Sequence, residues 1–213
     1  MKLYNYWRSG TSYRVRIALQ LKGISYEYEA VDLRTAAHKS QEFLSLNPQG
    51  LVPSLVLDDG TTLSQSPAII EYLEERYTDR PLLPADPAAR AQVRAMAAVI
   101  GCDIHPLNNL RILKYLRGDL RLDQNQTDIW AQRWISDGFS ALEAMLAADS
   151  SRGDFCHANQ PGLVECYLLP QIYSARRFNQ DMSAFPALCD IEKACMELAA
   201  FEKAFPENQP DAD

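Results

Sequence analysis

The sequence lacks three features that define large classes of protein: a long apolar run, a set of metal ligands and an excess of positive charge. No window of its 213 residues approaches the roughly 18 consecutive apolar residues that a membrane-spanning helix needs, so no membrane association is expected. The N-terminus has no apolar core, so no secretory signal is expected either. His38, His105 and His157 are scattered without metal-ligand spacing, so no metal is expected. A net charge of −7 argues against nucleic acid as a partner.

Cysteine is sparse as well. The five cysteines are odd in number and form no Cys-x-x-Cys pair, so we expect buried free thiols and a cytoplasmic location. They are Cys102, Cys156, Cys166, Cys189 and Cys195. With 47% hydrophobic and 23% charged residues, the composition is that of a globular protein, long enough for one large domain or two modest ones.

A stretch rich in hydroxyls and arginines, Trp7–Arg16, holds the most chemistry in the sequence. The alternating run Lys2–Tyr6 before it predicts a short β-strand. The segment Ser12–Lys22 after it has helical propensity and ends at Gly23, the residue type that favours the C′ position of a helix. The stretch is therefore predicted to form a strand-to-helix turn.

Such a turn is suited to binding an anion. The first N–H groups of a helix are unpaired and favour negative charge, and Ser9, Thr11 and Ser12 can each donate a hydrogen bond there. Three arginines add positive charge nearby, namely Arg8, Arg14 and Arg16. The same residues also fit an ordinary helix start with Ser12 as the N-cap and arginines at the surface. The stretch alone leaves both interpretations open.

The rest of the first third completes a βαβ–ββα order. Ser25–Val31 alternates and predicts a strand parallel to the first, and Gln41–Leu46 predicts a short helical turn. Ser54–Ser64 predicts a hairpin around an Asp-Asp-Gly turn. A helix is then predicted to start with Ser66 as N-cap and Pro67 at its first position.

Two features of this third could bind a peptide-like ligand. If the Val52–Pro53 bond in the loop Asn47–Pro53 were cis, the Val52 N–H and C=O would turn outward, as in an added strand. The N–H groups at the helix start and the Ser66 hydroxyl could hold a carboxylate instead of serving only as a cap.

The second half is predicted to be entirely helical. Thr78–Pro87 contains three prolines and predicts a linker, and Pro106 predicts a bend. The polar tail Pro206–Asp213 is expected to be mobile. The predicted helices are Ala88–Gly101, Gln126–Ala148, Leu163–Asn179 and Phe185–Ala204.

This order of elements resembles the glutathione transferases. The turn Arg8–Arg16, reading Arg-Ser-Gly-Thr-Ser-Tyr-Arg-Val-Arg, resembles that of the zeta class, which typically shows Arg-Ser-Ser-Cys-Ser-Trp/Tyr-Arg-Val-Arg. Further matching segments, in chain order, are Asn47–Pro53, Gln65–Leu73, His105–Arg111, Ala175–Phe178 and Gln209–Asp211. Two departures stand out. Gly10 and Thr11 replace the usual Ser and Cys, and Gly162 stands where the family has a Thr helix cap, at a cost of up to about 1 kcal/mol.

The resemblance implies a fold and a function. The fold is a thioredoxin-like glutathione-binding domain, residues 1–80, and an all-helical substrate domain, residues 88–213, in a homodimer. The implied activity is glutathione-dependent isomerisation of maleylacetoacetate to fumarylacetoacetate in aromatic amino acid catabolism. Alternatives are maleylpyruvate isomerisation in gentisate catabolism, and general transferase or dehalogenase activity on the same scaffold. A transferase activated by Tyr4 or Tyr6 is a further alternative, which the resemblance to the zeta class disfavours. The non-enzymatic alternative is a binding module, although such modules tend to lose the turn hydroxyl.

The chemistry is compatible with these residues. Isomerising a cis double bond needs a nucleophile that adds, permits rotation and leaves, and a thiolate can do all three. A thiol of pKa about 8.5 must first be ionised, and Ser9 at a helix start would stabilise the anion. The substrate, a dioxo acid with two carboxylates, needs cations, preferably bidentate ones.

The resemblance assigns the site residues as follows. The catalytic residues are Ser9, Thr11 and Arg8. The residues that bind glutathione are Ser9, Thr11, Gln49, Val52, Pro53, Gln65, Ser66, His105 and Asn109, with Gln65 and Ser66 on its γ-glutamyl carboxylate. The residues that bind substrate are Arg8, Arg111 and Arg177.

Overall fold

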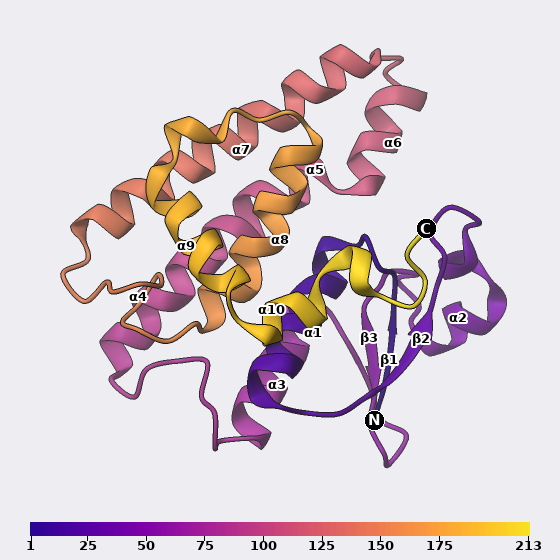
Figure 1. Cartoon of the computed structure of the whole chain (residues 1–213). Helices are drawn as coiled ribbons and strands as arrows, with labels where there is room; N and C mark the ends of the chain where they lie inside the picture. Colours follow the sequence, from indigo (N-terminus) through magenta and orange to yellow (C-terminus); the bar gives the residue numbers. More distant parts are fainter. The chain divides into compact units, whose positions relative to one another are not determined.

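A four-stranded sheet forms the centre of the N-terminal part in the computed structural model, which describes residues 1–213 (Figure 1). Its strands lie in the order β2-β1-β3-β4. They are β1 Lys2–Asn5, β2 Glu27–Ala30, β3 Ser54–Val56 and β4 Thr62–Ser64. β1 pairs with β2 in parallel, while β3 runs antiparallel to both β1 and β4. The predicted βαβ unit and hairpin are therefore confirmed.

Helices cover both faces of this sheet. Figure 1 shows α1, Gly10–Lys22, and α3, Ser66–Arg76, on one side and the short α2, Gln41–Leu46, on the other. α1 ends at Gly23 with a φ of 68°, a left-handed geometry that favours glycine, as predicted. The core between these layers is made of fully buried aliphatic side chains, among them Leu3, Val15, Ile17, Leu19, Leu55, Ile69 and Leu73.

Both N-caps predicted in this part are wrong by one turn or less. The cap of α1 is Ser9, whose Oγ accepts the Ser12 N–H at 3.3 Å. Ser12 itself is fully buried, and its Oγ accepts the Tyr6 N–H at 3.4 Å, so it cannot serve as the cap. The cap position of α3 is Gln65, and Ser66 is the first residue inside the helix.

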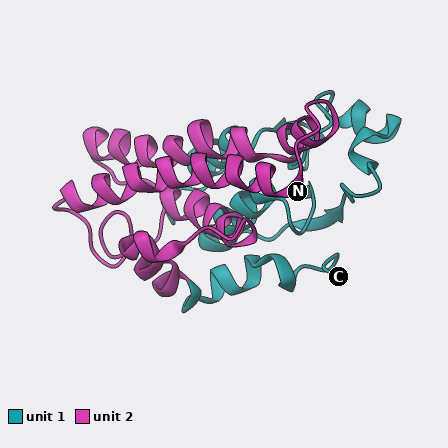
Figure 2. Cartoon of the chain, turned by 90° about the horizontal axis from the view of Figure 1, so that it is seen from above, with its two compact units in different colours: residues 1–82, 196–213 teal, residues 83–195 magenta.

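The chain divides into two compact units (Figure 2). Unit 1 comprises residues 1–82 and 196–213, and unit 2 comprises residues 83–195. The C-terminal segment 196–213 therefore packs with the sheet, whereas the sequence assigned it to the helical domain. None of the helices combines the length and apolar character needed to cross a membrane.

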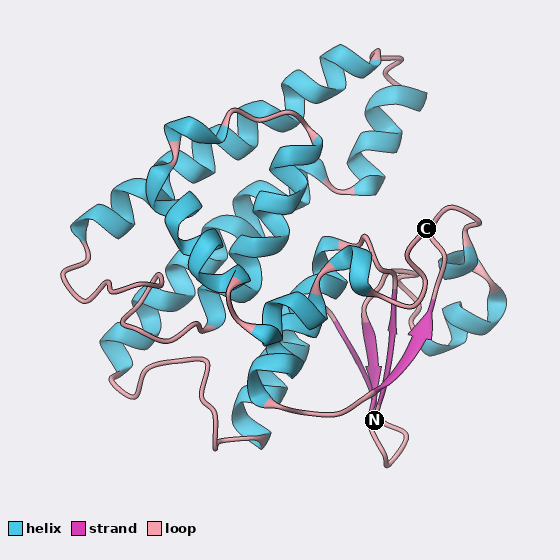
Figure 3. Ribbon diagram, in the orientation of Figure 1, coloured by secondary structure: helices cyan, strands magenta, loops and turns pink.

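Unit 2 is built of helices joined by loops, with one isolated β-bridge between Arg152 and Ala158, and the strands are confined to unit 1 (Figure 3). Its helices are α4 Pro87–Ala98, a π-helix Val99–Ile104, α5 His105–Asn108, α6 Leu110–Gly118, α7 Gln124–Ala148, α8 Leu163–Arg177, a 3₁₀ turn Met182–Ala184 and α9 Pro186–Met196, whose last residue belongs to unit 1. α7 packs so closely on the π-helix that a Cβ on Gly138 would lie 2.3 Å from Cγ1 of Ile104.

The predicted bend near Pro106 is present. Proline has no N–H and its ring displaces the carbonyl four residues earlier, and a π-helix immediately before it accommodates this disturbance. The chain then leaves helical geometry at Asn109, with φ −74° and ψ 164°, before α6 begins.

The predicted helix Phe185–Ala204 is two helices instead. Leu198 is extended, with φ −99° and ψ 128°, and separates α9 from α10, Ala199–Ala204. α9 packs within unit 2, where its Leu188 N–H donates to Glu143 at 2.9 Å, while α10 packs on α1. Helical periodicity continues through the break because both pieces bury an apolar face.

The prediction of a mobile tail is wrong. A 3₁₀ turn, Pro206–Asn208, follows α10. The amide of the buried Gln209 then donates to the Lys203 carbonyl at 2.9 Å and the Phe205 carbonyl at 2.8 Å. These bonds fold the tail back onto α10.

Gly162, at the start of α8, has no side-chain cap, but its N–H is bound by Glu165. The buried carboxylate of Glu165 accepts the N–H of Gly162 and that of Cys156, each at 2.7 Å. It therefore satisfies a helix-start donor that a threonine cap would leave to other groups. All five cysteines are free, but Cys102 is exposed and Cys189 half-buried, so only three are buried as expected.

Candidate active site

The turn between β1 and α1 presents Ser9 at the start of a 13-residue helix. The Ser9 N–H donates to the Tyr6 carbonyl at 3.0 Å, which closes the turn, and its carbonyl accepts the Tyr13 N–H at 2.8 Å. The side chain is half-buried, and no acidic residue lies in the first turn of the helix. A negative charge beside Ser9 would therefore meet the positive end of α1.

A chain of two hydrogen bonds, from Ser9 to Thr11 and from Thr11 to the Val52 carbonyl, determines where the Ser9 proton lies. The Thr11 hydroxyl donates to the Val52 carbonyl at 3.0 Å. The Oγ atoms of Ser9 and Thr11 are 3.0 Å apart. A hydroxyl has a single proton, so Thr11, which uses its proton on Val52, must accept from Ser9.

The Ser9 hydroxyl is thus a donor that can be redirected. Its oxygen is held by the Ser12 N–H, while its proton can rotate from Thr11 to a ligand atom. Thr11 has no second proton to offer unless it releases Val52. This arrangement favours Ser9 over Thr11 as the donor to an anion.

The loop before β3 is organised by Asn47, a buried residue that the sequence did not single out. Its amide donates to the Leu51 carbonyl at 2.8 Å and its oxygen accepts the Gln49 N–H at 3.1 Å. Gly50 has a φ of 58°, and a Cβ there would lie 2.8 Å from the His38 carbonyl. The Val52–Pro53 bond at the end of the loop is cis.

Gln49, Gln65 and Ser66 lie where the loop meets the start of α3. The Gln65 amide donates to Oε1 of Gln49 at 2.7 Å. Gln65 has φ 70° and ψ 116°, a strained backbone for a residue with a side chain. The Ser66 hydroxyl is buried at the first residue of α3 and has no hydrogen-bond partner.

An orphaned buried hydroxyl at a helix start is a fit for a carboxylate. An unpaired buried hydroxyl costs about 1–3 kcal/mol, and a bound carboxylate would satisfy it together with the first N–H groups of α3. Strained backbone such as that of Gln65 is concentrated at ligand sites. The residues predicted to hold the γ-glutamyl carboxylate therefore have the right chemistry for it.

Arg8, next to Ser9 in the turn, is half-buried. Its guanidinium carbon lies 5.1 Å from the centre of the Trp7 ring, a cation–π contact. Stacking constrains the guanidinium, and the planar, bidentate geometry of that group suits recognition of a carboxylate.

The other predicted residues lie in unit 2. His105 begins α5, and Asn109 caps α6, with its Oδ1 accepting the Arg111 N–H at 3.0 Å. Arg111 is exposed in the first turn of α6 and Arg177 is exposed in the last turn of α8. Asn109 therefore has a capping role whatever else it binds.

Two of the arginines near the turn have different roles from the surface positions that the sequence allowed. Arg14 and Arg16 are both buried. Burial lowers the pKa of Arg16, and its guanidinium donates to the Trp7 carbonyl at 2.8 Å and to Oδ1 of Asn5 at 3.0 Å. Arg16 is thus a structural residue of the turn and cannot bind substrate.

Comparison with known proteins relates this chain to a family. A family model for the N-terminal domain of glutathione S-transferases matches residues 8–76. The maleylpyruvate isomerase of Ralstonia sp is 54% identical over 213 residues, covering 100% of both chains. The maleylacetoacetate isomerase of Pseudomonas aeruginosa is 45% identical, covering 99% of this chain and 98% of its own.

Solved structures give the same result. A holo maleylpyruvate isomerase described as a bacterial zeta-class glutathione S-transferase has a TM-score of 0.98 and 52% identity, over 100% of both chains. The maleylacetoacetate isomerase of Methylobacterium extorquens AM1, solved with bound malonate and glutathione, has a TM-score of 0.96 and 37% identity, also over 100% of both chains.

Proposed function

Because this chain belongs to the zeta-class glutathione transferases, we propose that it is a glutathione-dependent cis–trans isomerase that converts maleylacetoacetate to fumarylacetoacetate. The observation that carries the proposal is the Ser9 hydroxyl, a donor that can rotate from Thr11 toward a ligand at the positive end of α1. A solved relative that bears the same activity in its name holds glutathione, which supports the cofactor.

The glutathione-binding residues of unit 1 have separate tasks. Ser66 and the start of α3 would hold the γ-glutamyl carboxylate, with Gln65 and Gln49 beside it. The Val52 N–H would pair with the peptide backbone of the ligand, because the Val52 carbonyl already accepts from Thr11. Pro53, His105 and Asn109 remain proposals from the family resemblance.

Bound glutathione supplies a thiolate that can add reversibly to the double bond of the substrate. The Ser9 hydroxyl would donate to the sulfur, and the first turn of α1 would lower the energy of its negative charge. The Ser12 N–H keeps the Ser9 oxygen in place, and Thr11, whose own proton is on the Val52 carbonyl, cannot replace Ser9 as the donor. The double bond forms again when the thiolate leaves, so no residue needs to act as a general base on the alkene.

The test is isomerisation measured with and without glutathione. We expect turnover of maleylacetoacetate to require glutathione and to leave its concentration unchanged, because the nucleophile departs again. Free glutathione is quantified by thiol titration before and after complete conversion. Equal rates in thiol-free buffer, or consumption of one glutathione per turnover, would contradict the proposal.

Maleylpyruvate is a second candidate substrate, favoured by a specific observation. The relative that is 54% identical is a maleylpyruvate isomerase. The two substrates differ only at the end remote from the alkene, so the Ser9 turn would act on both alike. A comparison of kcat/KM for the two under identical glutathione concentrations decides between them.

Substrate binding is proposed to depend on Arg8, Arg111 and Arg177, because a dicarboxylate needs cations in a chain of net charge −7. We expect Arg177→Lys to raise KM about tenfold, since lysine keeps the charge but loses the bidentate geometry. Arg176→Lys is the control, because Nε of Arg176 instead donates to Glu192 of α9 at 3.2 Å. Unchanged KM in both variants, or a rise only in the control, would exclude Arg177.

We also propose a homodimer, as is usual for this fold, and a cytoplasmic location, consistent with five free cysteines. Sedimentation at micromolar concentration and cell fractionation test these two points.

A further inference from the structure

The turn that presents Ser9 is held by the opposite end of the chain. Arg16, fully buried, donates from Nε to the Ala204 carbonyl at 3.1 Å. The same guanidinium donates to the carbonyls of Trp7 at 2.8 Å and Tyr6 at 3.4 Å. One rigid planar group therefore joins α10 to the two residues that close the Ser9 turn.

Asp211 makes a second connection to the same turn. Its Oδ2 accepts the Trp7 N–H at 3.1 Å, and its Oδ1 accepts the hydroxyl of Tyr28 on β2. Trp7 thus has its N–H bound by one terminal residue and its carbonyl bound by Arg16. Both backbone hydrogen-bonding groups of Trp7, two residues before Ser9, therefore have side-chain partners.

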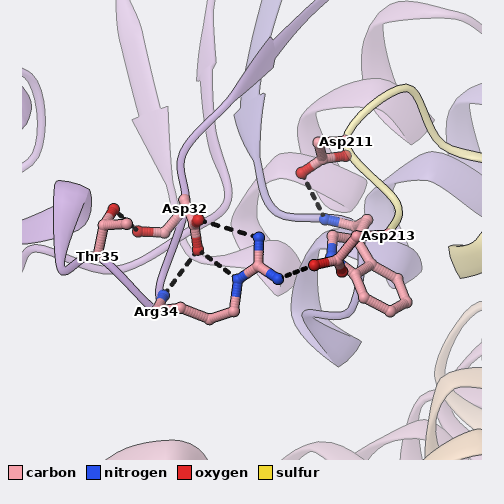
Figure 4. A network of polar contacts seen from close by, with 6 residues as sticks. Asp32, Arg34, Thr35, Asp211 and Asp213 are labelled. Carbon is pink, nitrogen blue, oxygen red and sulfur yellow. Dashed lines mark hydrogen bonds and ion pairs between the residues drawn. The ribbon is translucent and has the colours of Figure 1, made fainter.

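The neighbouring terminal contacts are of a different kind (Figure 4). Asp213 pairs with Arg34, which also pairs with Asp32 at 3.1 Å. The Arg34 and Asp213 side chains are exposed and Asp32 is half-buried, and none of these contacts involves the turn residues 6–9. Asp213 therefore offers a matched control for Asp211 on the same terminal segment.

We propose that Asp211 is a positioning residue for Ser9: its carboxylate fixes the Trp7 peptide, and with Arg16 it sets where the Ser9 hydroxyl points. This inference rests on the proposed function, because it assigns Ser9 to the glutathione sulfur. A donor to an anion acts at about 2.7–3.1 Å, and a displacement of 1 Å can lower a rate about 100-fold. The hydrogen bond that the Trp7 N–H donates to the Asp211 carboxylate is therefore part of the site.

The test compares Asp211→Ala with Asp213→Ala in the full-length chain. The first readout is the pKa of the thiol of bound glutathione, followed by thiolate absorbance as pH is raised. We expect Asp211→Ala to raise that pKa toward the value of a free thiol, about 8.5, and to lower kcat about 10- to 100-fold. Asp213→Ala should match the wild type in both.

Asp211→Asn tests whether geometry is what matters. Its amide oxygen can accept the Trp7 N–H while its nitrogen faces the Tyr28 oxygen, so it should restore most of kcat and the thiol pKa. A merely structural role for Asp211 predicts a lower melting temperature in Asp211→Ala with unchanged kcat and thiol pKa, and that result would overturn the inference. If the wild type itself neither binds glutathione nor lowers its thiol pKa, the proposed function fails instead.

Discussion

Ser9→Ala should lower kcat about 100- to 1,000-fold. Removing one preformed donor to a developing anion costs about 3–4 kcal/mol in the transition state. The wild-type Ser9 proton is the one that can rotate to a ligand, because Thr11 uses its own proton on the Val52 carbonyl. The measurement is kcat at saturating glutathione and substrate.

Ser9 also caps α1, so this substitution should reduce stability by about 1 kcal/mol. Ser40→Ala is the matched control, because the Ser40 side chain caps α2 by accepting the Phe43 N–H at 3.2 Å. It should lose a similar amount of stability and keep kcat. Thr11→Ala should have an intermediate effect on kcat. A larger loss in Thr11→Ala than in Ser9→Ala would show that Thr11 is the donor.

Lys22→Met should destabilise the protein by about 3–5 kcal/mol, because it leaves a buried charge without its partner. The Lys22 ammonium and the Glu74 carboxylate, whose side chains are 1% and 6% exposed, lie 2.7 Å apart. The ammonium also donates to the Tyr77 carbonyl at 2.8 Å and the Arg80 carbonyl at 3.0 Å. Losing it would leave the Tyr77 and Arg80 carbonyls without this donor and the Glu74 carboxylate without its cation, although that carboxylate still accepts the Leu82 N–H at 2.9 Å. Urea unfolding followed by circular dichroism measures the loss.

The control is the same substitution at an exposed pair. Lys2 lies 3.1 Å from Glu27 on β2, and water can replace either partner, so Lys2→Met should unfold close to the wild type. The double variant Lys22→Met/Glu74→Gln should recover part of the stability, because it removes the carboxylate charge that has lost its cation and keeps a side-chain oxygen for the Leu82 N–H. Equal unfolding midpoints for Lys22→Met and Lys2→Met would mean that the buried pair has no special importance.

Local signals in the sequence were sufficient for the order of elements in unit 1. Alternating runs, the Asp-Asp-Gly turn and Gly23 after a helical run each act within a few residues, so they predicted β1 to α3 and the parallel pairing of β1 with β2. The prediction of the α1 cap failed because Ser9, Thr11 and Ser12 are all residue types that cap helices well. Ser12 is buried and its hydroxyl accepts the Tyr6 N–H, which leaves Ser9 as the cap; local sequence patterns do not encode this contact.

The failures in the second half have a similar cause. The break at Leu198 divides a continuous periodic pattern because α9 packs in unit 2 and α10 packs on α1. The ordered tail depends on Asp211 reaching Trp7 across 204 positions of the chain. Arg16 belongs to a cluster of arginines in the sequence, yet it is buried because its guanidinium donates to the Tyr6 and Trp7 carbonyls of the turn. Site residues were predicted by motif, whereas the residues that support them were not.

The most direct test of the account is turnover with S-methylglutathione in place of glutathione. This analogue keeps both carboxylates and the peptide backbone but has no ionisable thiol. We expect it to bind, to compete with glutathione and to support no isomerisation of maleylacetoacetate or maleylpyruvate. Isomerisation with S-methylglutathione at a rate comparable to that with glutathione would contradict a mechanism in which Ser9 stabilises a nucleophilic thiolate.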